Sequence, residues 1–510
     1  MLLIFSPVAK ACEPPAGISR LAGFLRGNNQ ECTLWDANLE GQLYLLKQKQ
    51  SPVDTWSKRA WKNVQTNIEA LKSQRLYNNN DRYQRAVRDT NRALTQSCTD
   101  FDINISLADY QDTSLSPHRS RDLLRCAEEY KNNIFFPFFK KRLPELLARQ
   151  NDPWIGISIN YLSQAVPAFT LAGLIKKEYP TFNIIAGGGL ITSWLRGPAW
   201  VNPFTKLFKH LIAGPSEESL LKILTDTPSS GYQSPEFTGL SLDKYLAPGL
   251  ILPYNGSTGC YWNRCSFCPE KAEGNPYMTL PSEQIIKDLH MLVDKYNPGL
   301  IHMLDNAVAP ALMKHLIRDP VGAPWYGFAR VSRELSSLEF CRDLKNSGCV
   351  MLKLGIESGS QEVLDAMDKG INLELVEKSL WALKKAGIAT YVYLLFGTPS
   401  ETIDRARQTL DFTVRNADGI SFLNLAVFNL PRYSTECNTL ELRNFSDGDL
   451  GLYSDFKHPL GWNRQEVRKF LSSEFKAHPV IRPILQRDPP FFTSNHAPLL
   501  ARNTLKDNEE

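Results

Sequence analysis

The stretch Gly259–Pro269, with the sequence GCYWNRCSFCP, places Cys260, Cys265 and Cys268 on one short segment. They are three of the ten cysteines in the chain. A disulfide would use two of them and leave one over, whereas thiolates separated by four and then two residues can converge on one metal centre. The segment therefore predicts a metal centre that is held by three cysteines.

A structural zinc site is the alternative interpretation of this segment. Zinc normally takes four Cys or His ligands, usually from two paired motifs. The sequence contains no second CxxC pattern and no HxxxH pattern. Three cysteines without a fourth ligand favour a 4Fe-4S cluster instead, in which one iron stays open for a substrate or cofactor.

The segment also resembles the signature of the radical S-adenosylmethionine (radical SAM) enzymes, in which the gaps between three cysteines hold three and two residues and an aromatic residue precedes the last. Phe267 occupies that aromatic position. The first gap here holds four residues, Tyr261, Trp262, Asn263 and Arg264. The sequence of this segment is most similar to that of radical SAM proteins with an N-terminal cobalamin-binding type domain. The resemblance implies that Cys260, Cys265 and Cys268 hold a 4Fe-4S cluster that binds S-adenosylmethionine.

Length and composition limit the organisation of the chain. Its 510 residues predict two or three domains, and a hydrophobic content of 43% is enough for large cores. A formal net charge of +4 gives no reason to expect a nucleic-acid partner or a membrane surface. We expect the N-terminal MLLIFSP to form a strand rather than a signal peptide, and we expect no transmembrane segment. Irregularly spaced cysteines in a chain of this length indicate a cytoplasmic location.

Residues 1–230 are predicted to form a doubly wound, Rossmann-like α/β domain. Short apolar strands that alternate with helices are typical of a parallel sheet. The expected elements are strands at Leu2–Phe5, Cys32–Asp36, Trp154–Ile159 and Asn183–Ala186 and a helix at Pro167–Glu178. Residues from about 42 to 150 are too many for a simple connection, so we interpret them as a helical insertion, a lid or packing domain. Within it, we expect helices at Trp56–Leu76 and Asp81–Cys98.

The last of these strands runs into Gly187, Gly188 and Gly189. Glycines at the carboxyl end of such a strand let the backbone approach a ligand, but a tight strand-to-helix turn explains them equally well. The order of segments resembles the cobalamin-binding domain that precedes many radical SAM barrels. The DxHxxG motif, whose histidine ligates cobalt in part of that family, is absent. Two interpretations follow: a cobalamin bound without a protein histidine, or a domain that holds none.

Residues 245–430 are predicted to form a partial (β/α)6 barrel. The expected strands are Leu250–Tyr254, Leu300–Leu304, Pro324–Ala329, Val350–Gly355, Thr390–Phe396 and Ile420–Ala426. A barrel carries its chemistry at the carboxyl ends of its strands. The residues found there, which we take as cofactor-binding candidates, are Asp305, Arg330, Glu357, Ser358, Gly397 and Pro399. Any one polar residue among them can be a structural cap, but their shared position predicts a binding site.

The resemblance assigns roles to some of these residues. The run Gly355–Gly370 looks like the fourth-strand segment of radical SAM enzymes and implies that Glu357 contacts the bound nucleoside. The run Tyr393–Thr402 looks like the fifth-strand motif that flanks the adenine. Arg330 occupies a position where relatives often place a cation near the methionine carboxylate or the cluster, although a salt bridge within the barrel explains it equally well.

Residues 431–510 form a C-terminal extension that the resemblance does not cover. Its run DPPFFTSNHAP, Asp488–Pro498, is expected to close the open side of the barrel. His496 and Cys437 are candidates for contact with a substrate, but a lone histidine or cysteine is more often structural.

These features together predict a radical SAM enzyme that cleaves S-adenosylmethionine reductively and generates a deoxyadenosyl radical. The resemblance favours a cobalamin-dependent methyltransferase acting on unreactive carbon. A rearrangement or oxidation without cobalamin is one alternative, and a non-catalytic Fe-S redox or iron sensor is another. We expect an electron donor such as flavodoxin or ferredoxin, and the sequence leaves open whether the substrate is a small molecule or a peptide.

Overall fold

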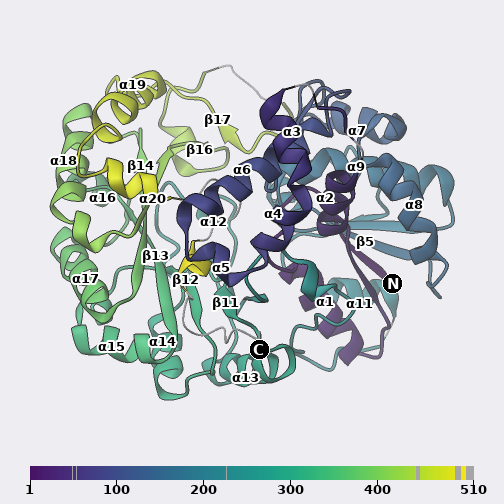
Figure 1. The fold of residues 1–510 in the computed structure, drawn as a ribbon, viewed down its shortest axis with the longest axis horizontal. Helices are drawn as coiled ribbons and strands as arrows, with labels where there is room; N and C mark the ends of the chain where they lie inside the picture. The colour runs from purple at the N-terminus through teal and green to yellow at the C-terminus, as the bar shows by residue number, and fades with distance from the viewer. Residues whose placement is uncertain (49, 53, 226, 444–447, 489–495, 501–510) are drawn as a thin grey trace. The chain divides into compact units, whose positions relative to one another are not determined.

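The computed structural model describes residues 1–48, 50–52, 54–225, 227–443, 448–488 and 496–500. The chain divides into two compact units (Figure 1). As far as it is described, the first unit contains residues 1–248 and 448–452, and the second contains residues 249–443, 453–488 and 496–500. The domain limits expected from the sequence at 230, 245 and 430 remain predictions.

The first unit is built on a parallel sheet with the strand order β2-β1-β5-β6-β7. The strands are β1 (Leu2–Phe5), β2 (Thr33–Asp36), β5 (Trp154–Ser158), β6 (Asn183–Gly187) and β7 (His210–Leu211). Every residue of β1 is buried, as expected for a central strand with both faces covered. The chain reverses its winding direction between β1 and β5, and ligands of such sheets bind beyond the carboxyl ends at that point.

The helices around this sheet include one that begins earlier than predicted. They are α1 (Ala16–Gly27), α2 (Ala37–Lys47), α9 (Leu162–Glu178), α10 (Gly189–Leu195) and α11 (Glu217–Leu224). We expected α9 to begin at Pro167, but this proline lies inside the helix. A proline cannot donate to the carbonyl four residues before it. That carbonyl, of Ser163, instead accepts a hydrogen bond from the Val8 amide at 3.3 Å.

The insertion is helical, as predicted, but one of its expected helices is wrong. In place of a single helix over Trp56–Leu76, the chain forms α3 (Thr55–Lys62), α4 (Val64–Leu71) and α5 (Gln74–Tyr77). Asn63 and Ser73 stand at the two interruptions, and both residue types favour caps over helix interiors. The remaining elements are α6 (Asn80–Gln96), β3 (Ile103–Ile105), β4 (Tyr110–Asp112), α7 (Ser120–Glu128), η1 (Tyr130–Asn132) and α8 (Phe136–Leu147), and η2 (Leu242–Lys244) follows near the end of the unit.

The second unit contains the six predicted parallel strands, in the order β15-β14-β13-β12-β11-β8. They are β8 (Ile251–Tyr254), β11 (Leu300–Met303), β12 (Trp325–Ala329), β13 (Cys349–Glu357), β14 (Ala389–Phe396) and β15 (Phe422–Val427). Within the part of the chain that is described, β8 and β15 each pair on one side only, which agrees with a partial barrel. All carboxyl ends therefore lie at one edge of the sheet.

Helices follow these strands along the outer side of the sheet, where Figure 1 shows α15, α17 and α18. They are α12 (Pro269–Ala272), α13 (Ser282–Tyr296), α14 (Pro310–Arg318), η3 (Glu334–Ser336), α15 (Leu338–Asn346), α16 (Gln361–Ala366), α17 (Leu373–Ala386), α18 (Ile403–Arg415) and η4 (Ala417–Gly419). The short strands β9 (Ser257–Thr258) and β10 (Met278–Thr279) pair antiparallel, and α12 lies between them in the chain. Helix α17 shows how the local sequence sets the ends, because the Asn372 side chain accepts from the Leu375 amide at the start.

Apart from residues 448–452, which belong to the first unit, the described part of the C-terminal extension belongs to the second unit. Its elements are β16 (Leu430–Pro431), η5 (Thr435–Asn438), β17 (Tyr453–Ser454), α19 (Arg464–Phe470), the π-helix η6 (Leu471–Phe475), α20 (Arg482–Arg487) and η7 (Ala497–Leu499). Residues 489–495 of the run expected to close the barrel lie outside the described residues. His496 is buried and stacks on the Tyr391 ring at 4.6 Å. No helix among the described residues is long and apolar enough to span a membrane.

Candidate functional site

Polar residues that follow β11 fix the start of the cysteine loop. Asp305 accepts a hydrogen bond from the Ser257 hydroxyl at 2.5 Å, and Asn306 donates to the Gly259 carbonyl at 3.0 Å. Burial raises the pKa of Asp305, and the hydrogen bond from Ser257 offsets part of this effect. Gly259 has a φ of 70°, and a Cβ there would lie 2.5 Å from the Pro276 carbonyl oxygen. Only glycine fits this entry into the loop.

The loop presents three free thiols, of which Cys265 is buried and Cys260 and Cys268 are half-buried. Burial raises the pKa of the Cys265 thiol, while the charges of Lys369 and Arg330 lower it. Burial also raises the pKa of Cys268, and backbone amides at the start of α12 lower it. Among the described residues, no three His, Cys, Asp or Glu side chains are close enough together to hold a metal ion. The three thiols thus share one loop but do not form a site for a single metal ion.

Arg330, at the end of β12, connects the loop to the chain that follows β13. Its guanidinium donates to the Cys265 sulfur at 3.8 Å and to the Lys369 carbonyl, and it lies over the Trp262 ring at 4.3 Å. Gly370 leaves room for this ring, because a Cβ there would lie 2.0 Å from Trp262. Arg330 forms no ion pair with a carboxylate in the described part of the chain, which argues against the salt-bridge interpretation. A cation beside a cysteine favours the thiolate, the form that ligates iron.

Glu357 and Lys369 form a buried ion pair beside this arginine. Their side chains are 12% and 7% exposed, and the Lys369 ammonium lies 2.8 Å from the Glu357 carboxylate. The same ammonium lies over the Phe267 ring at 5.4 Å. The structure therefore joins two predicted residues, Glu357 and Phe267, through a lysine that sequence reasoning missed.

Ser358 is buried and takes part in a local hydrogen-bond network. Its hydroxyl lies 3.1 Å from the Thr409 hydroxyl and accepts a hydrogen bond from the Ser360 amide at 3.1 Å. These contacts hold the turn between β13 and α16, although Ser358 is not the cap of that helix, whose N-cap is Ser360.

The turn that begins at Gly397 is held by the C-terminal extension. The Gly397 amide and the Trp462 indole nitrogen both donate to one carboxylate oxygen of Glu401, the second at 3.0 Å. Burial raises the pKa of Glu401 to about 7. His458 donates through Nε2 to the Thr398 carbonyl at 2.8 Å. Pro399 lies half-buried in the same turn.

The carboxyl edge of the first unit's sheet is held together by its own polar groups. Gly188 has a φ of 105°, and a Cβ there would lie 2.6 Å from the Ile159 carbonyl oxygen, so this turn needs glycine whether or not a ligand binds. Gly187 is half-buried, and the exposed Gly189 donates its amide to the Asn160 side chain at 3.0 Å.

Two side chains near β2 complete this internal network. The Tyr245 hydroxyl donates to the Asp36 carboxylate at 2.6 Å, and burial nevertheless raises the pKa of Asp36 to about 6. The Asn38 side chain accepts from the Ala9 amide at 2.8 Å and so fixes the segment after β1. The order of the sheet places this segment at the winding reversal described above.

Comparison with known proteins finds a family match within the second unit. Residues 254–413 match the Radical SAM superfamily. An uncharacterized methyltransferase of Pyrococcus horikoshii is 26% identical over 188 residues, which are 35% of this chain and 40% of that protein. An anaerobic magnesium-protoporphyrin IX monomethyl ester cyclase of Rubrivivax gelatinosus is 23% identical over 222 residues, 42% of this chain and 38% of that one. The chain thus spans about two fifths of the length of these curated relatives.

A solved structure shares the fold over most of the chain. The radical S-adenosylmethionine methyltransferase TsrM from Kitasatospora setae superposes with a TM-score of 0.51 at 14% identity, covering 85% of this chain and 74% of TsrM. Structures of TsrM contain tryptophan with an S-adenosylmethionine analogue, or cobalamin with a [4Fe-4S] cluster. Residues 254–413 thus match the Radical SAM superfamily, within a fold that the chain shares with TsrM.

Proposed function

We propose that this chain is a radical SAM enzyme that uses cobalamin to methylate an unreactive carbon. The observation that carries the proposal is the continuous contact from Cys265 through Arg330 and Lys369 to Glu357. It links the cysteine loop to the residue expected to contact the nucleoside. A sensor that only holds a cluster does not need a residue that contacts the nucleoside.

The donor set fits a 4Fe-4S cluster, because three free thiols lie on one loop with two cations beside Cys265. Cys260, Cys265 and Cys268 would ligate three irons. Such a cluster would bind S-adenosylmethionine at its open iron and would supply the electron for cleavage of the sulfonium.

The protein's own residues position the substrate and exclude water. Lys369 and Arg330 stabilise the Cys265 thiolate, and Lys369 also orients the Glu357 carboxylate. Gly397, held by Glu401, gives the nucleoside a turn without side-chain bulk.

We assign cobalamin to the carboxyl edge of the first unit's sheet, near Gly187–Gly189. The fold shared with TsrM supports this assignment, since a TsrM structure contains both cobalamin and a cluster. The reductant would be a small electron-transfer protein such as flavodoxin or ferredoxin, acting in the cytoplasm.

The test is an anaerobic incubation of reconstituted protein with S-adenosylmethionine and a strong reductant, with and without cobalamin, and with product masses measured. We expect S-adenosylhomocysteine only when cobalamin is present and no product from a variant with all three loop cysteines replaced by alanine. Deoxyadenosine alone under both conditions would instead support a rearrangement or oxidation. Equal product yields from the cysteine variant and the native chain would refute the proposal.

A further inference from the structure

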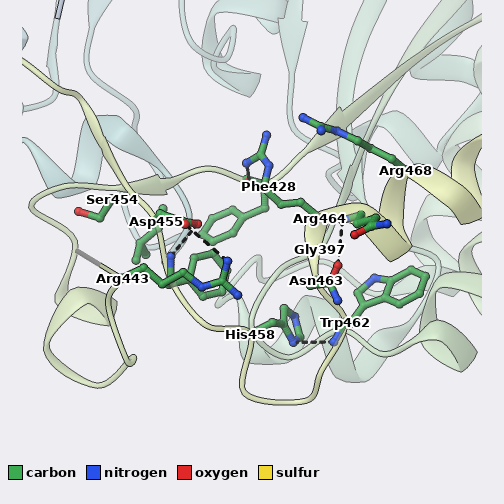
Figure 2. Close-up of a pocket in the computed structure, with 13 residues that line it drawn as sticks. Gly397, Phe428, Arg443, Ser454, Asp455, His458, Trp462, Asn463, Arg464 and Arg468 are labelled. Atoms are coloured by element: carbon green, nitrogen blue, oxygen red, sulfur yellow. Dashed lines mark hydrogen bonds and ion pairs between the residues drawn. The ribbon is translucent and has the colours of Figure 1, made fainter. Parts of the chain in front are cut away.

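A pocket of about 420 Å³ lies beyond the ends of β14 and β15 in the second unit (Figure 2). It is lined by Gly397, Phe428, Leu430, Arg443, Ser454, Asp455, Phe456, His458, Trp462, Asn463, Arg464, Gln465 and Arg468. None of these residues belongs to the cysteine loop. Gly397 alone belongs to the set of predicted cofactor-binding residues. The volume is in the range of small-molecule sites.

The C-terminal extension builds one wall of the pocket. Leu442 pairs with Phe456 in an antiparallel bridge, and the Arg443 amide donates to the Asp455 carbonyl at 3.0 Å. The Arg443 guanidinium also pairs with the Asp455 carboxylate at 3.7 Å, an ion pair that Figure 2 marks. The half-buried Phe456 adds an aromatic surface to this wall.

Helix α19 builds the opposite wall and presents two arginines to the pocket. Trp462, which donates a hydrogen bond to Glu401, fixes the chain just before the helix. Arg464 and Arg468 are four residues apart, so they share one face of the helix. Like charges at this spacing destabilise a helix unless a counter-charge is supplied.

The charges that line the pocket are not balanced. Arg464 donates to the Phe428 carbonyl at 2.9 Å and to the Asn429 side chain at 2.6 Å, and both acceptors are neutral. The Arg468 guanidinium forms no hydrogen bond or ion pair with the described residues, and no dashed line reaches it in Figure 2. The one lining carboxylate, Asp455, already pairs with Arg443.

The remaining titratable group adds no negative charge. His458 donates through Nε2 to a carbonyl, while its Nδ1 accepts backbone amides, so the ring is neutral in this arrangement. Its burial lowers its pKa, in agreement with this form. Two of the three arginines are thus left without a counter-charge in the described structure.

We infer that this pocket binds a small molecule through a carboxylate or phosphate group held by Arg464 and Arg468. Arginine presents a planar fork of donors that matches both groups. Phe456 lies on the facing wall and offers a surface for the apolar part of the ligand. That this ligand is the methyl acceptor rests on the proposed function, whereas the anion site itself does not.

Calorimetric titration of the reconstituted full chain with inorganic phosphate and with succinate, at constant ionic strength, tests the site. We expect saturable binding of at least one probe. The probe that binds more tightly shows whether the site prefers a phosphate or a carboxylate group. Arg468→Gln should weaken binding about tenfold or more, because it removes a charge-assisted contact. Its melting temperature should change little, since the exposed Arg468 guanidinium has no hydrogen bond or ion pair with the described residues to lose.

The matched control is Lys469→Gln combined with Lys476→Gln, which removes two exposed charges from the same segment outside the pocket. This control should bind the probes as the native chain does. Cys265→Ala should also retain binding, which separates failure of the anion site from failure of the radical chemistry. Absence of saturable binding by both probes, or an equal loss in the lysine control, would overturn the inference.

Discussion

The two sheets place polar residues at equivalent edges but use them differently. At the edge of the first, Asp36 is held by Tyr245 and Asn38 by the backbone of Ala9, so these side chains bind the protein itself. At the edge of the second, Arg330 and Lys369 direct their charges at Cys265 and Glu357. The comparison teaches that a position at a strand end does not specify a role, whereas a network of charges around a reactive group does.

Loss of Cys265 should have the largest effect and should be confined to the second edge. We expect Cys265→Ala to lose cluster iron and S-adenosylmethionine cleavage to background, because two thiols remain for a cluster that needs three. Iron analysis and visible absorbance measure the loss. Cys437→Ser, a half-buried cysteine outside the loop, is the control and should retain both. A variant at Cys265 that keeps its iron would contradict the assignment.

Loss of the buried ion pair between Glu357 and Lys369 should have the next largest effect. Lys369→Met leaves Glu357 buried without a counter-charge, which we expect to cost the second unit about 3–5 kcal/mol in unfolding free energy. Hydrogen exchange resolved by peptide measures each unit separately. The double variant E357Q/K369M should recover much of this stability without recovering S-adenosylmethionine binding.

The exposed pair of Lys384 with Asp418 provides a control for this charge effect. Lys384→Met should cost less than about 1 kcal/mol, because solvent screens the pair. Equal stability of the Lys369 and Lys384 variants would show that the buried pair has no special role.

Two glycine substitutions sharpen the comparison between the edges. Gly370→Ala would push against Trp262 and Gly188→Ala against the Ile159 carbonyl, and each should cost about 2–3 kcal/mol in its own unit. Because Trp262 lies under Arg330, the first variant alone should also weaken retention of iron. Iron loss in the Gly188 variant would show that the carboxyl edge of the first sheet also affects retention of iron by the second unit.

The smallest effect concerns the pH dependence of the first edge. The folded-state pKa of Asp36 is raised to about 6, so its stabilising contribution is present at low pH and is lost as the pH rises through that value. Between pH 5 and pH 8 the native chain should lose on the order of 1 kcal/mol more than Asp36→Asn, which does not titrate. Exchange of the α2 amides, compared at each pH, measures the difference. Identical pH dependence in both proteins would show that the pKa of Asp36 is not raised in the folded state.

Much of the fold follows from local sequence, because apolar runs and caps decide the strands and helices. The motifs single out Glu357 and Phe267, whose site roles stay predictions, but they do not single out Lys369, which contacts both. Its pairing depends on the chain reversing at Asp368 and Gly370, both of which have positive φ. The roles of His458 and Trp462 were missed for a similar reason, since they reach the Gly397 turn from more than fifty residues away.

The most direct test of the account is an electron paramagnetic resonance spectrum of the reduced, cluster-reconstituted chain before and after addition of S-adenosylmethionine. If three cysteines leave one iron open for this molecule, its binding should change the spectrum of the cluster, and Cys265→Ala should show no cluster signal. A cluster signal that S-adenosylmethionine leaves unchanged, or one that persists in Cys265→Ala, would contradict the central claim.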